Sequence, residues 1–350
     1  GLVRFDAAGQ IEPSLAERWI VIDDGRSFIF RLREAQWSDG EPVTAAQVVK
    51  ALRRAAAPDS RNALAPFLAV IDEVVEMTPQ VIEVRLKRPR PDLLQLFAQP
   101  EMAVVQGQIG SGPFRIARSD GRGTLLRPAP DMAVPDAAPA PEETALLRGE
   151  RAAAALARFK EGQSDLILGG SFADWPIVGA AEIAPANIRV DPALGLFGLV
   201  VARREGFLAD PANRAAIAMA IDRAALTGAV KPDWAAVETL LPARLDSAAA
   251  PAQPAWSSLA LDARRANAAA RVAVWRRAHP TPLTIRIALP PGPGATIVWA
   301  YLLDAMRAIG VEAIRVGAND PAELRLIDAI APYDSGRWFA ATACAPCSEA

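Results

Sequence analysis

Histidine and cysteine, which most metal sites and many catalytic sites require, are almost missing from this sequence. Its 350 residues include one histidine, His279, and two cysteines, Cys344 and Cys347. A structural zinc site takes four ligands, mostly Cys and His, and a serine-type triad needs a histidine beside its nucleophile. His279 stands at the end of a helical stretch, where the helix dipole favours a cation. We therefore predict no metal site, no cofactor and no enzymatic activity.

An excess of charge of one sign and long apolar runs are also missing. The 38 basic and 40 acidic residues are interspersed and give a formal net charge of −2. Without a basic stripe, or basic residues interleaved with aromatic ones, the sequence does not predict a nucleic-acid partner. No apolar run reaches the roughly 18 residues of a membrane-spanning helix. The length favours two or three domains of a globular protein.

Two short motifs resemble functional ones but lack their context. A C-x-x-C pair does redox chemistry at the N-terminus of a helix, where the thiol pKa is lowered, whereas Cys344 and Cys347 follow small residues at 340–343. We interpret them as a local disulfide or two ordinary thiols, and a thiol-redox enzyme that uses both is the weaker alternative. The GSGP stretch at 110–113 is no phosphate loop, because Arg115 stands where a dinucleotide fingerprint needs its third glycine.

The clearest local pattern is a strand, a turn and a capped helix. Every second residue from 28 to 32 is large and apolar, which predicts a strand. The Trp-Ser-Asp-Gly sequence at 37–40 favours a tight turn, because Gly allows positive φ and Asp bonds its own backbone. Thr44 then stands at the N-cap of a helix predicted over 45–57. We predict that Trp37 is buried beneath this turn and that its role is structural.

Similar patterns predict further elements along the chain. Residues 70–77 and 81–87 alternate around a Thr-Pro-Gln turn and predict a β-hairpin. Residues 165–168 are interpreted as a short buried strand. From residue 263 onward, helical and strand patterns alternate as in a parallel α/β sheet. The remaining predicted elements are helices at 92–97, 152–160, 263–278 and 295–309, and strands at 196–201, 283–289, 312–316 and 324–327.

Several landmarks, taken in their order along the chain, resemble one known family. They are IEPSLAERW at 11–19, the strand at 24–33 with the WSDG turn after it, GSGPFRI at 110–116, a helical stretch at 214–225 with the sequence RAAIAMAIDRAA, and a helical stretch at 300–311 that ends in AIGV. Any one of them is a weak signal by itself. Together they resemble the extracytoplasmic solute-binding proteins of family 5, which serve ABC importers of peptides, nickel and opines.

The resemblance implies an α/β fold of the periplasmic-binding-protein type II, with two lobes and an extra small α/β domain. The small domain is expected at 1–106, the core of the first lobe at 107–213 and the second lobe at 214–350. The chain is expected to be trimmed at both ends, with its signal peptide removed. The missing leader is therefore no argument against export.

The function that the resemblance implies is that of the substrate-binding subunit of an ABC importer. Such a protein binds a small molecule or a peptide-like solute in a cleft between its lobes and delivers it to permease subunits at the membrane. We expect a monomer in the periplasm, without catalysis. A sensory or accessory ligand-binding protein, which docks on a receptor instead of a permease, is the alternative.

The resemblance and the local sequence point to six candidate ligand-binding residues. One follows the strand predicted at 165–168, and the carboxyl ends of strands in open α/β sheets face ligand crevices. One stands near the position of a family asparagine, and four lie where the family has a pocket wall in the second lobe. In that order they are Trp175, Arg203, Tyr333, Asp334, Arg337 and Trp338.

Pro332 leads to a prediction about the ligand. Oligopeptide binders of this family carry an acidic residue before the tyrosine, and that acid pairs with the amino terminus of the peptide, whereas here Pro332 precedes Tyr333. A buried ammonium without a carboxylate partner is heavily penalised. We therefore predict weak or absent binding of free-amine peptides. The ligand is expected to be uncharged or anionic, with Arg337 and Arg203 as its cationic contacts.

Overall fold

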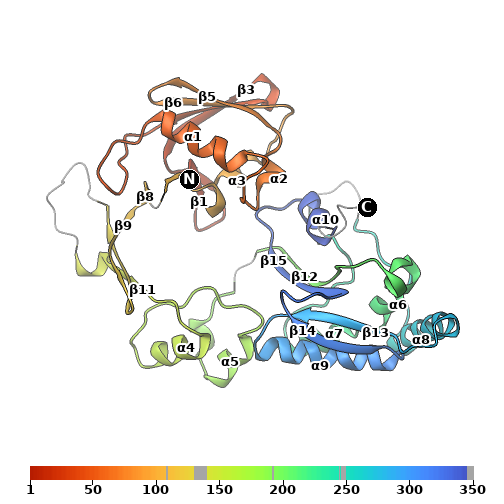
Figure 1. Ribbon diagram of the computed structural model, residues 1–350. Coiled ribbons are helices and arrows are strands. Elements are labelled where there is room, and N and C mark those ends of the chain that lie inside the picture. Colours follow the sequence, from red (N-terminus) through yellow and green to blue (C-terminus); the bar gives the residue numbers. More distant parts are fainter. Residues whose placement is uncertain (108, 130–139, 191–192, 244, 246–249, 345–350) are drawn as a thin grey trace. The chain divides into compact units, whose positions relative to one another are not determined.

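The computed structural model describes residues 1–350 except 108, 130–139, 191–192, 244, 246–249 and 345–350. The chain forms two compact units, Gly1–Gly149 and Glu150–Ala350 (Figure 1). Both units combine sheets with helices, as predicted for an α/β protein. The division in two does not test the boundaries predicted after residues 106 and 213, which stay predictions.

The main sheet of the first unit is antiparallel, with strand order β3-β4-β6-β5. Its strands are β3 (Ala16–Ile22), β4 (Ser27–Leu32), β5 (Ile71–Thr78) and β6 (Val81–Leu86). Phe28 and Phe30 of β4 are buried together with the residues opposite them on β6, Val84 and Ile82. The predicted strand at 28–32 and the predicted hairpin are therefore confirmed.

Helix α1 (Ala45–Ala56) begins at its predicted cap and packs against β5 and β6. The Thr44 hydroxyl accepts a hydrogen bond from the Gln47 backbone N–H, and the Gln47 side chain accepts one from the Thr44 N–H at 2.9 Å. This reciprocal pair is a capping box. Gln47 Oε1 also accepts a hydrogen bond from Trp37 Nε1 at 3.0 Å. Trp37 is 2% exposed, which confirms its predicted burial.

The other elements of the first unit are short. Strand β1 (Val3–Phe5) pairs with β2 (Ile11–Pro13), β7 (Val105–Gln106) pairs with β8 (Ile109–Gly110), and β9 (Phe114–Asp120), β10 (Gly123–Pro128) and β11 (Ala145–Leu147) form a three-stranded sheet. The helical pieces are α2 (Ala65–Leu68), α3 (Leu93–Phe97), η1 (Asp23–Gly25), η2 (Pro100–Met102) and η3 (Pro141–Glu143). The GSGP stretch meets the WSDG turn, because Ser38 N–H donates to Gly110 O at 2.9 Å.

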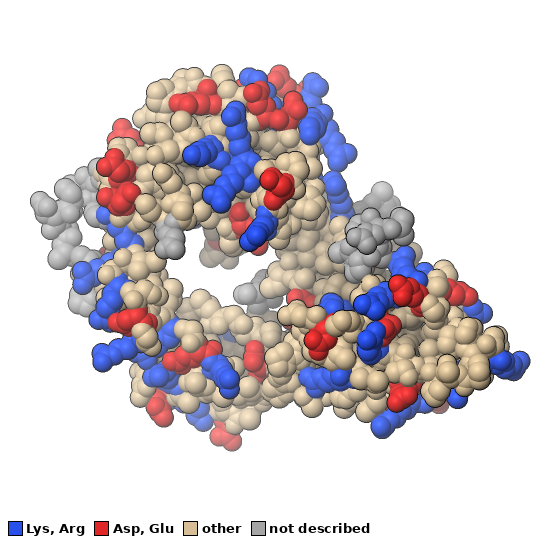
Figure 2. All heavy atoms as spheres, viewed as in Figure 1, with Lys and Arg blue, Asp and Glu red and all other residues tan. Residues whose placement is uncertain are grey.

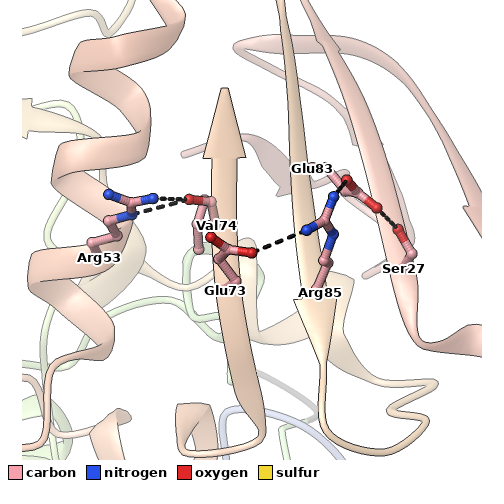
Figure 3. Close-up of polar contacts among 6 residues, drawn as sticks. All are labelled: Ser27, Arg53, Glu73, Val74, Glu83 and Arg85. Carbon is pink, nitrogen blue, oxygen red and sulfur yellow. Dashed lines mark hydrogen bonds and ion pairs between the residues drawn. The ribbon is translucent and has the colours of Figure 1, made fainter. Parts of the chain in front are cut away.

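A polar network of Ser27, Glu73, Glu83 and Arg85 connects strands β4, β5 and β6 of the main sheet (Figure 3). Glu83 accepts hydrogen bonds from Ser27 Oγ at 2.6 Å and from Arg85 at 2.7 Å, and Arg85 also pairs with Glu73 at 3.0 Å. The Glu83 side chain is 8% exposed. The hydrogen bonds from Arg85 and Ser27 hold the pKa of the Glu83 carboxyl below its usual value.

We expect the Glu83→Gln variant to unfold more easily at neutral pH. A carboxyl whose pKa is lowered by folding stabilises the folded state above its unfolded pKa, roughly 4.3. That stabilisation disappears as the pH falls through the lower folded pKa. Urea unfolding should therefore show a loss of about 1–3 kcal/mol at pH 7 and a smaller loss near pH 3. Glu76→Gln, at an exposed position of β5, is the control. An equal loss for Glu83→Gln at both pH values contradicts the charge-based explanation.

The sheet of the second unit has strand order β12-β15-β13-β14. Its strands are β12 (Gly195–Val201), β13 (Thr284–Leu289), β14 (Glu312–Gly317) and β15 (Leu324–Ile330). Strand β13 runs parallel to β14 and to β15, whereas β12 is antiparallel to β15. Helix α9 (Pro293–Ala308) connects the parallel strands β13 and β14. The predicted parallel α/β alternation is therefore confirmed.

Helices cover both faces of this sheet. One hydrophobic core joins β13 and α9 to α6 (Pro211–Ala220), α7 (Arg223–Val230) and α8 (Leu261–Ala278). Helix α10 (Gly336–Cys344) contacts β12, and Figure 1 shows it on the side of the sheet away from α9. The remaining helical elements are α4 (Ala152–Lys160), α5 (Trp175–Ala180), η4 (Pro185–Asn187) and η5 (Gly206–Ala209).

Two expectations for the second unit are wrong. Residues 165–168 form no strand, and Leu166 and Leu168 are 68% and 78% exposed. These residues pair with no strand among the described residues. The stretch at 214–225 is not one helix, because α6 ends at Ala220 and α7 begins at Arg223. Asp222 caps α7 by accepting a hydrogen bond from Ala225 N–H at 3.0 Å.

Candidate functional site

The carboxyl edge of the second sheet is the natural place for a ligand site in this unit. Strands β13, β14 and β15 are parallel, so their carboxyl ends lie at one edge, and open α/β sheets bind ligands there. Strand β15 pairs with β13 only at Leu324 and Arg325. Its later residues pair with β12 alone and extend beyond the end of β13 as a two-stranded ribbon.

Two glycines bring the segment that precedes α5 to this edge. Gly294 N–H, at the start of α9, donates to Ala173 O at 2.9 Å. A Cβ on Gly294 would lie 1.9 Å from Phe172 O, and one on Gly292 would lie 3.0 Å from Ala173 O. Gly292 also has φ 121°, which side chains other than glycine rarely adopt. The close approach therefore requires glycine, and it places Trp175, the first residue of α5, beside α9.

Trp175 is half-buried, with one aromatic and one cationic neighbour. Its ring lies 6.2 Å from the ring of Trp234, and Lys231 Nζ lies 5.5 Å from the centre of the Trp175 ring. Lys231 also forms an ion pair with Asp233. Trp175 and Trp234 both pack against the hydrophobic core. The core thus holds an indole that remains partly open, which suits stacking on a ligand.

The ribbon of β12 and β15 places a second group of side chains at the same edge. Phe172, three residues before Trp175, packs edge-on against Phe197 of β12, with ring centres 4.8 Å apart. Phe197 is 39% exposed and lies directly opposite Asp328 of β15. Burial raises the pKa of the Asp328 carboxyl. Sequence reasoning missed Asp328, because only the strand register pairs it with Phe197.

The segment at 333–338 follows the end of β15, as the sequence suggested, but half of its candidate side chains are inside the protein. Tyr333 and Trp338 are buried, and Trp338 packs edge-on against Phe339 at 4.9 Å. Asp334 and Arg337 are exposed. Tyr333 and Trp338 therefore pack inside the unit, whereas Asp334 and Arg337 are open to solvent.

Arg203 lies at the other end of the ribbon. It follows β12, and its N–H donates to Glu323 O at 3.3 Å, at the start of β15. The seven-residue paired stretch spans roughly 20 Å. Along this strand pair, the structure thus brings Trp175 and the start of the 333–338 segment to one edge and leaves Arg203 at the opposite one. Their roles in binding stay predictions.

The two other residues that the sequence offered for catalysis or metal binding, His279 and Cys344, lie at the C-terminal ends of helices. His279 follows α8, and its ring stacks on Trp275 with centres 4.0 Å apart. Cys344 is exposed and ends α10, so it does not occupy the helix N-terminus that would activate a thiol. Cys347 lies outside the described residues. Within the described part of the chain, no three His, Cys, Asp or Glu side chains gather as a metal site.

Surface charge and the apolar character of the helices bear on the partners of the chain. Figure 2 shows acidic and basic side chains interspersed on the visible face of both units. None of the helices in the described residues combines the length and the apolar character needed to cross a membrane.

The chain matches known proteins in sequence and in structure. Residues 10–319 match the family model of bacterial extracellular solute-binding proteins, family 5. The periplasmic murein peptide-binding protein MppA of Escherichia coli K12 is 25% identical over 271 residues, 67% of this chain and 50% of that protein. The probable deoxycholate-binding periplasmic protein YgiS of the same strain is 33% identical over 120 residues, 29% of this chain and 22% of that protein.

The structure of OppA from Burkholderia pseudomallei is similar to this one, with a TM-score of 0.77 at 22% identity, covering 97% of this chain and 75% of that chain. This likeness confirms the predicted class, an α/β fold of the periplasmic-binding-protein type. At this identity it is a likeness of fold alone. The two curated relatives are matched over half of their length or less.

Proposed function

Because this chain belongs to the bacterial extracellular solute-binding proteins of family 5, we propose that it is the substrate-binding subunit of an ABC importer. It binds a small molecule or a peptide-like solute, acts as a monomer in the periplasm and delivers its ligand to permease subunits at the membrane. Its signal peptide has been removed in the mature protein. The family match over most of the chain supports this proposal, and so does the arrangement at the carboxyl edge of the second sheet.

The position of Trp175 is the structural observation that carries the proposal. An indole held half-open by the core, beside Trp234 and Lys231, lies at the sheet edge where α/β proteins bind ligands. Ligand sites in proteins combine apolar and aromatic walls with a few fixed polar groups. In this proposal Tyr333 and Trp338 support the wall, while Asp334 and Arg337 supply polar contacts, and Arg203, at the opposite edge of the sheet, is not assigned to this site.

The side chains at this edge favour binding over catalysis. Aromatic rings, a lysine that is already ion-paired and a carboxylate can hold a ligand by stacking and by charge. Acyl transfer and hydrolysis need a nucleophile within hydrogen-bond reach of a base, whereas the side chains named at this edge are suited to stacking and charge contacts. The protein therefore retains its ligand unchanged until the permease accepts it.

Native mass spectrometry of the full-length protein tests this proposal, because a closed binding protein can retain its ligand during purification. We expect a bound small molecule or short peptide. Trp175→Leu should weaken its binding about tenfold, the loss of roughly 1.4 kcal/mol. Trp275→Leu is the matched control, because Trp275, near the end of α8, stacks on His279 and packs edge-on against Phe207. Equal affinity for both variants contradicts the Trp175 site. Failure to bind any component of a periplasmic extract contradicts the proposed function.

A further inference from the structure

We propose that Lys231 is the anion-binding group of the site at Trp175, and that the ligand presents a carboxylate to it beside a planar apolar group. Until the ligand arrives, the carboxylate of Asp233 occupies the ammonium, and the ligand displaces it. The inference rests on the proposed function, because it names the chemical class of the ligand that the subunit carries. The ligand expected from Pro332 was uncharged or anionic, and the inference narrows it to an anionic one.

A tight turn at the end of α7 carries most of the groups involved. Lys231 follows the last residue of α7, and its backbone N–H donates to Thr227 O at 2.9 Å. Trp234 N–H donates to Lys231 O at 3.0 Å and closes the turn. Between them stand Pro232, whose ring fixes φ at a value that suits a turn, and Asp233. The backbone therefore fixes the positions of Lys231 and Trp234 relative to α7.

The ammonium of Lys231 is held in place, whereas its carboxylate partner is open to water. The Lys231 side chain is 15% exposed, and the side chain of Asp233, with which it forms an ion pair, is 73% exposed. Lys231 Nζ lies 5.5 Å from the centre of the Trp175 ring, which is within reach of a cation–π contact. A largely buried ammonium requires an anionic partner, but an exposed carboxylate gains little from an ion pair, because water solvates it.

This asymmetry allows a ligand carboxylate to replace Asp233. The exchange substitutes one carboxylate for another, so the ammonium keeps a charge-assisted hydrogen bond throughout. Among the described residues, Asp233 is the one carboxylate paired with Lys231. Because Asp233 is exposed, the side of the ammonium that it covers faces the solvent from which a ligand approaches. The hydrogen bond from Lys231 lowers the pKa of the Asp233 carboxyl, so at neutral pH the ligand competes with a charged group.

The surroundings of Lys231 suit a planar apolar group next to the ligand carboxylate. The rings of Trp175 and Trp234 lie 6.2 Å apart with an angle of 33° between their planes. Both are half-buried and pack against the hydrophobic core. Indole rings that remain partly open stack on planar groups. An aromatic acid, or a peptide-like solute with an aromatic residue at its carboxyl end, combines the two features.

Lys231 was not among the cationic contacts that the sequence suggested. Of those, Arg203 lies at the opposite edge of the sheet, and Arg337 is exposed. Lys231 comes close to Trp175 because α5 and α7 both contact α9, and no short stretch of sequence shows this packing.

Calorimetry with pairs of probes that differ in one charge tests the inference on the full-length protein. The pairs are phenylacetate and phenylacetamide, and N-acetyl-phenylalanine and its amide. The parent protein should bind the anionic member of at least one pair about tenfold tighter or more. Lys231→Met, which keeps the apolar stem of the side chain, should lose that preference and leave the affinity for the neutral member unchanged. Lys160→Met, at the exposed end of α4, should behave as the parent.

Asp233→Asn gives a second readout, because a merely structural ion pair and a displaceable one predict opposite results. Removing the internal competitor makes the ammonium available in a larger fraction of the molecules, so the anionic probes should bind about threefold tighter. The neutral probes should bind as before. If the pair only stabilises the turn, its loss weakens the binding of both kinds of probe. Asp262→Asn, at an exposed position on α8, is the control.

Equal binding of both members of each pair, or an undiminished preference in Lys231→Met, overturns the inference while the proposed function stands. Unchanged or weaker binding of the anionic probes by Asp233→Asn does the same, and this variant remains informative if Lys231→Met does not fold. If no probe binds, the component retained from a periplasmic extract replaces the probes, and a component without an anionic group overturns the inference alone. If no component is retained either, the inference and the proposed function fail together.

Discussion

Replacing Trp37 with alanine is expected to destabilise the first unit by about 3–5 kcal/mol, as large-to-small changes in a core do. The ring is almost fully buried, and its Nε1 donates to Gln47 Oε1 within the capping box of α1. The turn is closed by backbone hydrogen bonds from Trp37 N–H to Glu41 O at 2.8 Å and from Gly40 N–H to Trp37 O at 2.9 Å. Removing the ring therefore leaves a cavity and loosens both the turn and the helix start.

Urea unfolding of the first unit measures this effect, and Trp19→Ala is its control. Trp19 lies on β3, an edge strand, and is only half-buried, so its loss should be clearly smaller. The structural role of Trp37 is refuted if Trp37→Ala unfolds like the parent protein but loses ligand affinity. That result assigns Trp37 to the binding surface.

Replacing Gly294 with alanine is expected to disturb the candidate site as well as stability. The added Cβ would lie 1.9 Å from Phe172 O, a separation that backbone atoms do not tolerate, so α9 and the segment at 172–173 must move apart. Overpacking of this kind costs about 1–3 kcal/mol. Because the same segment carries Trp175, we also expect a changed tryptophan emission and weaker ligand binding.

Gly228→Ala is the matched control for this substitution. Gly228 lies within α7, and no atom is close to the position of its Cβ. Alanine there should stabilise the helix by roughly 0.5–1 kcal/mol. Denaturant unfolding and ligand titration of both variants separate the effect of the close approach from that of a lost glycine. A neutral or stabilising Gly294→Ala contradicts the packing at the start of α9.

The two glycines at α9 illustrate what local sequence does not show. Residues 290–294 contain two glycines and three prolines and lie between the strand predicted at 283–289 and the helix predicted at 295–309. Their contact with Phe172 and Ala173 joins segments more than a hundred residues apart. The Trp175 position was predicted at a strand end, which is wrong for residues 165–168. Trp175 nevertheless lies at a sheet edge, because α9, which follows β13, holds the segment before it.

Local sequence by itself determined the elements whose signals lie within a few residues of one another. The alternation in β4, the capping box of Thr44 and Gln47, the β5–β6 hairpin and the β13–α9–β14 unit all follow from such short-range patterns. The order of the family landmarks, extending over most of the chain, determined the family and the fold class.

Only the tertiary structure decided which side chains meet at the candidate site. Phe197 and Asp328 are opposite each other because β12 and β15 pair in one register, and a shift of one residue would turn Asp328 to the other face. Tyr333 and Trp338 are buried although their sequence suggested an open wall. Strand register and burial depend on contacts between distant segments, and the free energies of those contacts are not encoded in any short stretch of sequence.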